Sequence, residues 1–202
     1  MTVMEPVVRA SPPEDSDAHD RWVWNRRFEV LYHMRLSTLY HQKREHYFAR
    51  ADLLCTLLIT ISAASAVAAL LKQVAVVDLA VSVATAILAV VQLVLNFGAR
   101  AREHGKLAVD YRRLRAEAER AGLRWTEEQC SDFSARALEI EADEPPPLGA
   151  LVVYCQNELA VAMKQPDKRF PLRPYERWFM QLWNFDAAAI CARRDQAQPA
   201  AR

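Results

Sequence analysis

The sequence predicts an all-α integral membrane protein, in which a two-span helical hairpin is continuous with a cytoplasmic helical bundle. Three observations support this fold class. Two apolar runs of membrane-spanning length lie close together in the chain, and polar segments with helical periodicity flank them on both sides. The 202 residues also include only four glycines, which disfavours a turn-rich β fold and favours long helices.

The two apolar runs, residues 53–71 and 79–98, contain no charged side chain. At 1.5 Å per residue each helix would be about 30 Å long, which matches the hydrocarbon core of a bilayer. Residues 72–78 form so short a connection that the two spans are expected to be antiparallel. The alternative is a soluble protein with two fully buried helices, but two uncharged runs of this length seldom share a soluble core.

Basic residues beside the spans predict which side of the membrane each end faces. The connection contains one base, Lys72, and one acid, Asp78. The other ends of the spans are rich in bases: Lys43, Arg44, Arg50, Arg100, Arg102, Lys106, Arg112, Arg113 and Arg115. Because cytoplasmic flanks carry the excess of Lys and Arg, both termini are expected in the cytoplasm.

The segments outside the hairpin differ in composition. Residues 1–20 are rich in proline and acid, so they predict a disordered tail, and they lack the basic start and apolar stretch of a signal peptide. Residues 21–52 predict a cytoplasmic helix that enters the first span, and residues 99–165 predict cytoplasmic helices after the second. Each span is therefore expected to continue, without a break, as a long cytoplasmic helix.

Local signals divide the region after the second span. Gly122 predicts the end of the long helix, and Thr126-Glu-Glu-Gln129 is a capping box that predicts the start of the next one. The acids Asp143 and Glu144 predict a helix start at the positive end of a helix dipole. A further helix is expected over residues 148–164.

Residues 166–202 predict a proline-containing linker and an aromatic helix that begins near Pro174. The aromatic stretch Trp178–Phe185 follows several bases and allows two interpretations. It is either an interfacial membrane anchor or a helix docked against the cytoplasmic bundle. Docking is favoured slightly, because the apolar residues are consecutive and are not confined to one helix face.

Polar side chains form a stripe along the second span. Its members are Asp78, Ser82, Thr85, Ala89, Gln92 and Asn96, with Arg100 and Glu103 continuing the face at the cytoplasmic end. At about 100° per residue, the four members with strong hydrogen-bonding groups inside the span fall within an arc of roughly 80°. The stripe either holds helices together by hydrogen bonds or lines a water-filled path in an oligomer, and the residues alone favour the first. One hairpin cannot enclose a channel, so a pore requires a homo-oligomer.

The first span carries a face of small residues. Cys55, Ser62, Ser65, Ala66 and Ala69 share this face and include two small-xxx-small pairs. Small side chains let helix backbones approach closely. This packing face is expected to meet either the hairpin partner or a neighbouring subunit.

We find no motif for catalysis or for a cofactor. The chain has no Gly-rich phosphate loop, metalloprotease motif or nucleophile motif, so we expect neither an enzyme nor a bound metal or cofactor. His41 and Glu45 lie one helical turn apart, but surface pairing is a better interpretation than a metal site, and the same applies to His104. The four cysteines fit neither a disulfide framework nor a zinc motif. A net charge of +1 gives no support for a nucleic-acid partner.

Several short stretches together resemble the SLATT domain, a two-transmembrane effector module of bacterial conflict systems. The resemblance covers roughly residues 35–165. The matching stretches are YHQKREHYF at 40–48, AREH at 101–104, Tyr111, ADEPP at 142–146 and CQNELA at 155–160. They occur in this order around the predicted hairpin.

The resemblance implies a pore-forming effector of the bacterial inner membrane. Such an effector would oligomerise and disable the infected cell in anti-phage, abortive-infection defence. No sensor domain is recognisable in this chain, so the trigger would be a separate sensor protein or a nucleotide second messenger. The resemblance also shifts the preferred interpretation of the stripe to pore lining. The alternative function is a non-conducting two-span membrane scaffold or adaptor, which recruits a partner through its cytoplasmic helices.

Overall fold

A computed structural model describes the backbone of residues 18–72 and 75–197 and the side chains of residues 18–64 and 79–194. Within these residues the structure is all-helical and has no strand, which confirms the all-α part of the predicted fold class. Segments within 18–64 and 79–120 each contain a helical stretch long and apolar enough to cross a membrane, by length and composition. The predicted tail over residues 1–20 lies almost wholly outside the described part of the chain.

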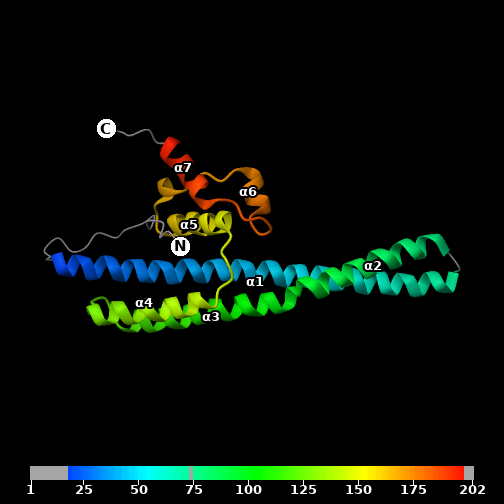
Figure 1. The fold of residues 1–202 in the computed structure, drawn as a ribbon, viewed down its shortest axis with the longest axis horizontal. Helices are drawn as coiled ribbons and strands as arrows, with labels where there is room; N and C mark the ends of the chain where they lie inside the picture. The colour runs from blue at the N-terminus through cyan, green and yellow to red at the C-terminus, as the bar shows by residue number, and fades with distance from the viewer. Residues whose placement is uncertain (1–17, 73–74, 198–202) are drawn as a thin grey trace. The chain divides into compact units, whose positions relative to one another are not determined.

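Figure 1 traces the helices in chain order. They are α1 (Ala18–Lys72), α2 (Ala75–Leu95), α3 (Phe97–Arg120), α4 (Glu127–Ala142), α5 (Gly149–Ala162), the 3-10 turn η1 (Pro166–Lys168), α6 (Pro174–Phe179) and α7 (Ala187–Ala197). The described residues form two compact units. The hairpin unit comprises residues 42–105, and the helical unit comprises residues 18–41 and 106–197.

The predicted continuous helix across the second span is interrupted at one residue. α2 ends at Leu95 and α3 begins at Phe97, because Asn96 adopts a positive φ of 44°. Asparagine tolerates this left-handed conformation better than most residues. The Asn96 amide still donates to the Gln92 carbonyl (2.9 Å), and the Arg100 amide donates to the Asn96 carbonyl (3.1 Å). The break therefore changes the local helix geometry without leaving these backbone groups unbonded.

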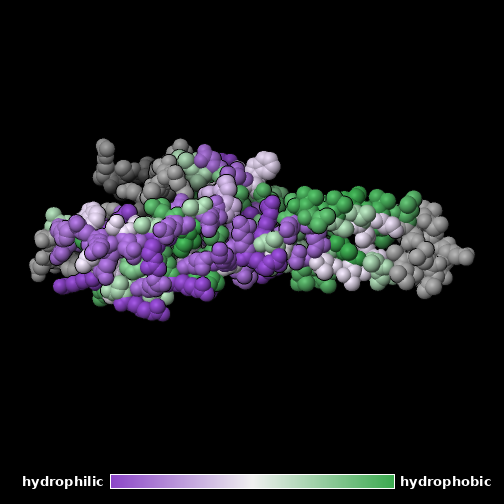
Figure 2. Space-filling view, turned by 60° about the horizontal axis from the view of Figure 1, so that its bottom comes forward, coloured by the Kyte–Doolittle hydropathy of each residue, from purple (hydrophilic) through white to green (hydrophobic). Residues whose placement is uncertain are grey.

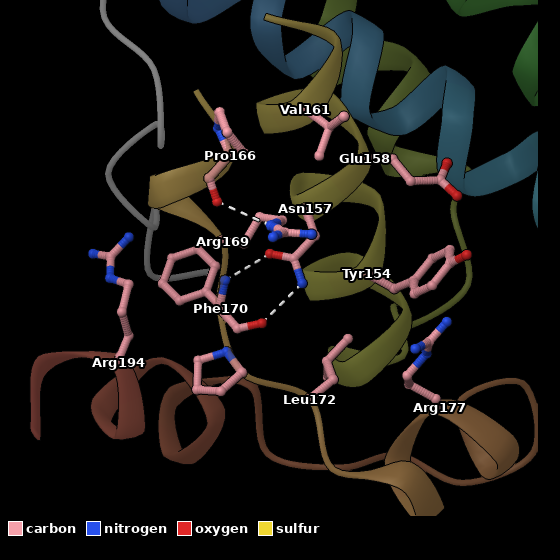
Figure 3. A pocket seen from close by; sticks show the side chains of 11 residues that line it. Tyr154, Asn157, Glu158, Val161, Pro166, Arg169, Phe170, Leu172, Arg177 and Arg194 are labelled. Atoms are coloured by element: carbon pink, nitrogen blue, oxygen red, sulfur yellow. Dashed lines mark hydrogen bonds between the residues drawn. The ribbon is translucent and has the colours of Figure 1, made fainter. Parts of the chain in front are cut away.

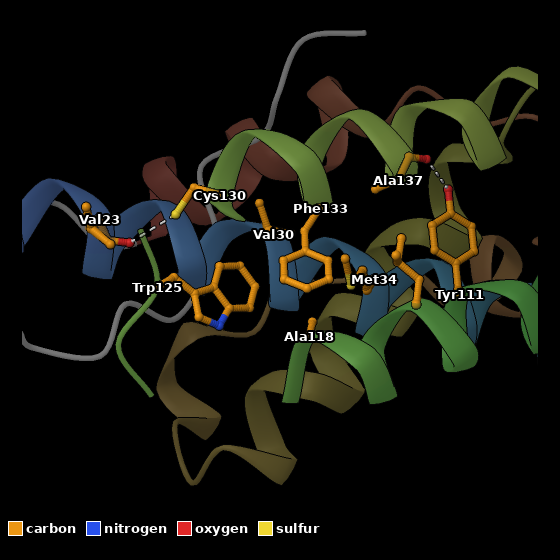
Figure 4. Packing of buried hydrophobic residues seen from close by; sticks show 10 residues of the cluster. Val23, Val30, Met34, Tyr111, Ala118, Trp125, Cys130, Phe133 and Ala137 are labelled. Atoms are coloured by element: carbon orange, nitrogen blue, oxygen red, sulfur yellow. Dashed lines mark hydrogen bonds between the residues drawn. The ribbon is translucent and has the colours of Figure 1, made fainter. Parts of the chain in front are cut away.

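One core of the helical unit lies between α1, α3 and α4. Figure 4 shows the ring of Phe133 from α4 among side chains of α1 and α3, including Met34 and Ala118. Trp125 packs on Phe133 with ring centroids 4.8 Å apart. Burying a side chain of this kind contributes about 1.5–3 kcal/mol. Burial along α3 follows the helical repeat, since Leu107, Tyr111, Leu114 and Ala118 are all buried.

α5 is buried on two faces, which explains why its sequence is almost entirely apolar. One face packs with α6, η1 and α7 through residues such as Val153 and Ile190. The other face packs Leu151 and Cys155 against Tyr40 of α1. The Asn157 side chain also accepts from the Phe170 amide (2.7 Å) and donates to the Phe170 carbonyl (2.9 Å), which fixes the segment after η1.

Three predicted helix signals are confirmed and one is wrong. Thr126 and Gln129 form the capping box of α4, Gly122 follows α3 with a φ of +86°, and Pro174 opens α6. Asp143 and Glu144 do not start a helix, because Asp143 is the C-cap of α4. The prolines that follow disfavour helix in the residues before them, so α5 begins only at Gly149.

The predicted aromatic helix is much shorter than expected. α6 ends at Phe179, a turn follows, and α7 begins at Ala187. α7 was not predicted, although Asp186 gives a signal for it: its carboxylate accepts from the Ala188 amide (2.9 Å), as an N-cap does. The predicted docking is correct for Met180 and Phe185 and wrong for Trp178 and Trp183, which are 83% and 69% exposed.

Candidate functional site

The predicted stripe lies in the hairpin unit, where α1 and α2 run side by side. Half-buried side chains recur at three- and four-residue steps on both helices. They are Asp52, Cys55, Ile59 and Ser62 on α1, and Val81, Thr85, Leu88 and Gln92 on α2. This spacing is typical of two helices that pack along a coiled-coil seam. Most of the other described side chains of these two apolar stretches are exposed.

The predicted packing face of the first span takes part in this seam. Cys55 and Ser62 are half-buried on the side of α1 that contacts α2, so they meet the hairpin partner within one copy. The side chains of Ser65, Ala66 and Ala69 lie outside the described residues. Which of the two expected partners these three meet therefore stays a prediction.

Gln92 makes a polar contact between the two helices. Its Nε2 donates to Thr56 Oγ1 (3.0 Å) and to Asp52 Oδ1 (3.3 Å). Hydrogen bonds between helices in hydrocarbon contribute on the order of 1 kcal/mol each. Thr85 does not join this contact, because its hydroxyl donates to the Val81 carbonyl of its own helix (2.8 Å). Gln92 therefore holds α1 and α2 together within a single copy.

The structure divides the stripe into two lines. Thr85 and Gln92 are half-buried toward α1, whereas Ser82, Ala89 and Asn96 are exposed. The three exposed positions are seven residues apart, so they follow one line along the outside of the hairpin. Asp78 belongs to the predicted stripe, but its side chain lies outside the described residues. Among the described residues of the stripe inside the span, the exposed polar groups are thus the Ser82 hydroxyl and the Asn96 amide.

Two glycines allow close approach between α1 and α3. A Cβ atom on Gly98 would lie 3.3 Å from Asp52 Oδ2, and one on Gly105 would lie 3.1 Å from Glu45 Oε1. The two glycines are seven residues apart, as are the two carboxylates. These glycines are therefore positions of close contact between helices, and neither of them coincides with the break at Asn96.

Phe48 is the centre of an aromatic and cationic cluster in the hairpin unit. Its buried ring stacks on His104 (centroids 5.6 Å apart) and on Phe97 (6.3 Å). The guanidinium of Arg44 lies 4.4 Å from the ring centroid and that of Arg100 lies 5.8 Å away. Each such contact contributes about 0.5–2 kcal/mol. The predicted surface role of His104 is wrong, because the side chain is buried in this stack.

The two residues predicted at the cytoplasmic mouth are both exposed. Arg100 and Glu103 lie on α3, beyond the break at Asn96. Their side chains are accessible on the surface of the hairpin unit. The break means that they do not continue the helical line of the stripe as one regular helix would.

A second polar cluster lies inside the helical unit. His41 is fully buried, with Nε2 3.0 Å from Glu144 Oε1, at an ion-pair separation but without the alignment of a hydrogen bond. The ring of Tyr111 stacks on His41 with centroids 6.1 Å apart. Burial raises the pKa of the Tyr111 hydroxyl, and the Glu144 carboxylate raises it further. The predicted surface pairing of His41 with Glu45 is therefore wrong.

This cluster joins three stretches that are far apart in the sequence. The Leu148 amide donates to the Tyr40 hydroxyl (3.1 Å), so the segment after α4 is bonded to α1 beside His41. The sequence contained a signal for this burial, because His41 lies seven residues after the apolar Met34 and helical periodicity places both on one face. Both side chains are fully buried. The arrangement binds elements together and has the geometry of a structural contact.

Comparisons with protein-family models, with curated proteins and with solved structures find no match to this chain. The resemblance to the SLATT domain therefore stays a prediction from short motifs. His41, Tyr111 and Glu144, which all lie in those motifs, contact one another in the helical unit.

Proposed function

We propose that the chain is a membrane effector, which oligomerises and forms a pore that disrupts the inner membrane in bacterial anti-phage defence. The observation that carries the pore is the line of Ser82, Ala89 and Asn96, because its two polar members are exposed where all other exposed side chains of residues 79–96 are apolar. Polar side chains facing lipid are unfavourable, so this line favours a location against other copies or water. The defence role and the bacterial inner membrane rest on the SLATT resemblance.

Membrane insertion is supported by where the apolar side chains lie. Figure 2 shows hydrophobic residues gathered over α2 and the second half of α1. In the most apolar stretch of the second candidate span, no residue is buried, and in the first only 6% are. A soluble protein would bury these helices, whereas lipid solvates them where they are. The distribution of bases favours a cytoplasmic location for both termini.

Pore formation requires several copies in a closed ring. In such a ring the exposed line of each α2 faces the axis, with Asp78 at the outer end and Arg100 and Glu103 at the cytoplasmic mouth. Gln92 and Thr85 face α1 instead, and the bonds of Gln92 to Thr56 and Asp52 hold each hairpin together. The Ser82 hydroxyl and the Asn96 amide supply the water-facing groups.

The trigger is a separate sensor protein or a nucleotide signal that acts on the helical unit. α1 is a single helix from Ala18 to Lys72, and Asn96 interrupts the other connection. A rotation of α1 about its axis would be transmitted along the helix to the first span. The break at Asn96 would let α2 change its tilt. The trigger must bind the open arrangement better than the closed one.

Ion leak from proteoliposomes tests the pore. The informative variant combines Ser82→Leu with Asn96→Gly, because glycine keeps the positive φ and removes the amide. We expect at least a tenfold loss of leak with membrane insertion unchanged. Val83→Leu is the matched control, since Val83 is exposed beside the line and is already apolar. Undiminished leak in the double variant would exclude Ser82 and Asn96 from the lumen.

The second candidate function is a non-conducting scaffold or adaptor. It is favoured by Gln92, whose amide is bonded within one hairpin, so a single copy is already complete as an anchor. Inducible expression in a bacterium distinguishes the two functions. A pore depolarises the cells when it is triggered, whereas an adaptor leaves the membrane potential unchanged.

A further inference from the structure

Large apolar side chains gather on one surface of the helical unit, which we call the aromatic cap. Its members, all exposed, are Tyr175, Trp178, Phe179, Leu182 and Trp183. They come from α6 and the turn after it, a stretch of nine residues. So many exposed aromatic side chains in one place are typical of a surface that binds something.

The segment that carries the aromatic cap is fixed to the helical unit from beneath. Glu176 is buried, and its carboxylate accepts from Arg193 Nη2 (2.7 Å) and from the Arg173 amide (2.7 Å). The Gly149 amide donates to Asn184 Oδ1 (3.0 Å). A Cβ on Gly149 would lie only 2.2 Å from the Phe185 carbonyl oxygen, so the backbones touch there. The exposure of the cap is therefore imposed by packing on its other side.

Exposed basic side chains occur in the same stretch of the chain as the aromatic cap. Lys164, Arg169, Arg173 and Arg177 are exposed between residues 164 and 186, where the exposed acids are Asp167 and Asp186. The buried Glu176 does not offset this charge, since Arg193 already pairs with it. Exposed bases thus outnumber exposed acids in this stretch.

A pocket of about 640 Å³ is lined in part by Arg177, which precedes Trp178 of the aromatic cap in the chain (Figure 3). Three arginines line it, Arg169, Arg177 and Arg194, against one carboxylate, Glu158. Arg194 lies 4.2 Å above the ring of Phe170. Arg169 Nε donates to the Pro166 carbonyl (2.9 Å), which is a neutral acceptor. The pocket suits an anionic group.

We propose that the aromatic cap and this arginine pocket bind an anionic lipid surface. Trp and Tyr rings prefer the depth of the headgroups, where one end of the ring is apolar and the other is wet. Arginines beside them bind lipid phosphates. The cap is not a helix stripe that a partner helix would fit, because α6 has only six residues and the turn supplies Leu182 and Trp183. The inference rests on the membrane location in the proposed function, which keeps a lipid surface near this unit.

Fluorescence quenching in nanodiscs tests the proposal on the full chain. The lipids carry a nitroxide near the headgroup, with and without anionic phosphatidylglycerol. We expect lipid quenching of tryptophan emission to fall at least twofold in the double variant Trp178→Gln, Trp183→Gln. The matched control is Trp22→Gln, because Trp22 is 50% exposed on α1 of the same unit and should not change the quenching. Arg169→Gln with Arg177→Gln should remove the part that depends on anionic lipid.

Equal lipid quenching in the double variant and in the unchanged chain would overturn the proposal. Protection of Trp178 and Trp183 from both aqueous acrylamide and the labelled lipid would also overturn it, because a protein surface would then cover them. Extraction with alkaline carbonate scores membrane insertion separately. If insertion fails, the same quenching comparison with added anionic vesicles still decides whether the cap binds lipid.

Discussion

The hairpin unit and the helical unit distribute polar and apolar side chains in opposite ways. In the helical unit the apolar side chains of Met34, Leu151 and Ile190 are fully buried. In the hairpin unit most leucines and valines are exposed, and the amide of Gln92 turns inward to bond Thr56. The contrast teaches that a water-solvated core accounts for the helical unit alone, whereas the exposed apolar side chains of the hairpin unit fit the lipid location proposed for it.

Matched leucine truncations give the largest expected difference between the units. Leu151→Ala leaves a cavity in the helical unit and should lower the free energy of unfolding by about 2–5 kcal/mol. Leu93→Ala, at a side chain that is 80% exposed, should change it by less than about 0.5 kcal/mol. Denaturant unfolding in detergent measures both. Equal losses would mean that Leu93 is packed in the native assembly, and the contrast between the units would weaken.

The buried His41–Glu144 pair should contribute more to the free energy of unfolding than the partly exposed His33–Glu141 pair. His41→Ala removes the partner of Glu144 in the interior and should cost about 1–3 kcal/mol. His33 lies 3.8 Å from Glu141 with both side chains partly exposed, so His33→Ala should cost at most about 1 kcal/mol. The same unfolding assay compares them. Similar losses of unfolding free energy for the two variants would show that burial does not strengthen the contact between His41 and Glu144.

Alkaline pH should weaken the helical unit through Tyr111. Burial and Glu144 raise the pKa of this hydroxyl above that of the unfolded chain, which is about 10. The neutral form is fully present in both states below pH 10, so the stabilisation is intact there and is lost as pH rises further. The loss is about 1.4 kcal/mol per pH unit above 10. Tyr111→Phe should remove this share of the dependence, and a slope unchanged by the substitution would contradict the assignment.

The smallest effect on stability is expected from the hydrogen bonds of Gln92 between α1 and α2. Gln92→Leu removes the bonds to Thr56 and Asp52 and should cost on the order of 1 kcal/mol. Ser82→Ala is the control, because its exposed hydroxyl should contribute little to a single hairpin. Unfolding of the monomer in detergent measures both variants. A larger cost for Ser82→Ala would mean that the two lines of the stripe are assigned the wrong way round.

Sequence reasoning succeeds where the signal is local. The uncharged runs, the Thr126–Gln129 capping box and Gly122 each depend on neighbouring residues, and the helices they predict are present. Helical periodicity also supported the cytoplasmic helices expected after the second span, and burial in α3 repeats with the helix turn at Leu107, Tyr111 and Leu114.

Other features depend on residues far apart in the chain. His41 is buried because Glu144, more than a hundred positions later, lies beside it. Gln92 and Ser82 lie on the same predicted face of the second span. Only the position of α1 shows that the side chain of Gln92 points inward and that of Ser82 is exposed. The exposure of Trp178 depends on contacts of Glu176 and Phe185 beneath it, which no short pattern encodes. The left-handed Asn96 also has no distinctive neighbour in the sequence.

Cysteine accessibility tests the central claim most directly, because it asks which solvent each side of α2 meets. Ser82→Cys and Leu93→Cys are introduced singly into a chain whose own cysteines are replaced by alanine, reconstituted in liposomes and triggered to leak. A charged, membrane-impermeant thiol reagent should modify the cysteine at 82 and leave that at 93 unmodified, since water reaches the first and lipid surrounds the second. Rapid modification at both positions, or at neither, would contradict the account.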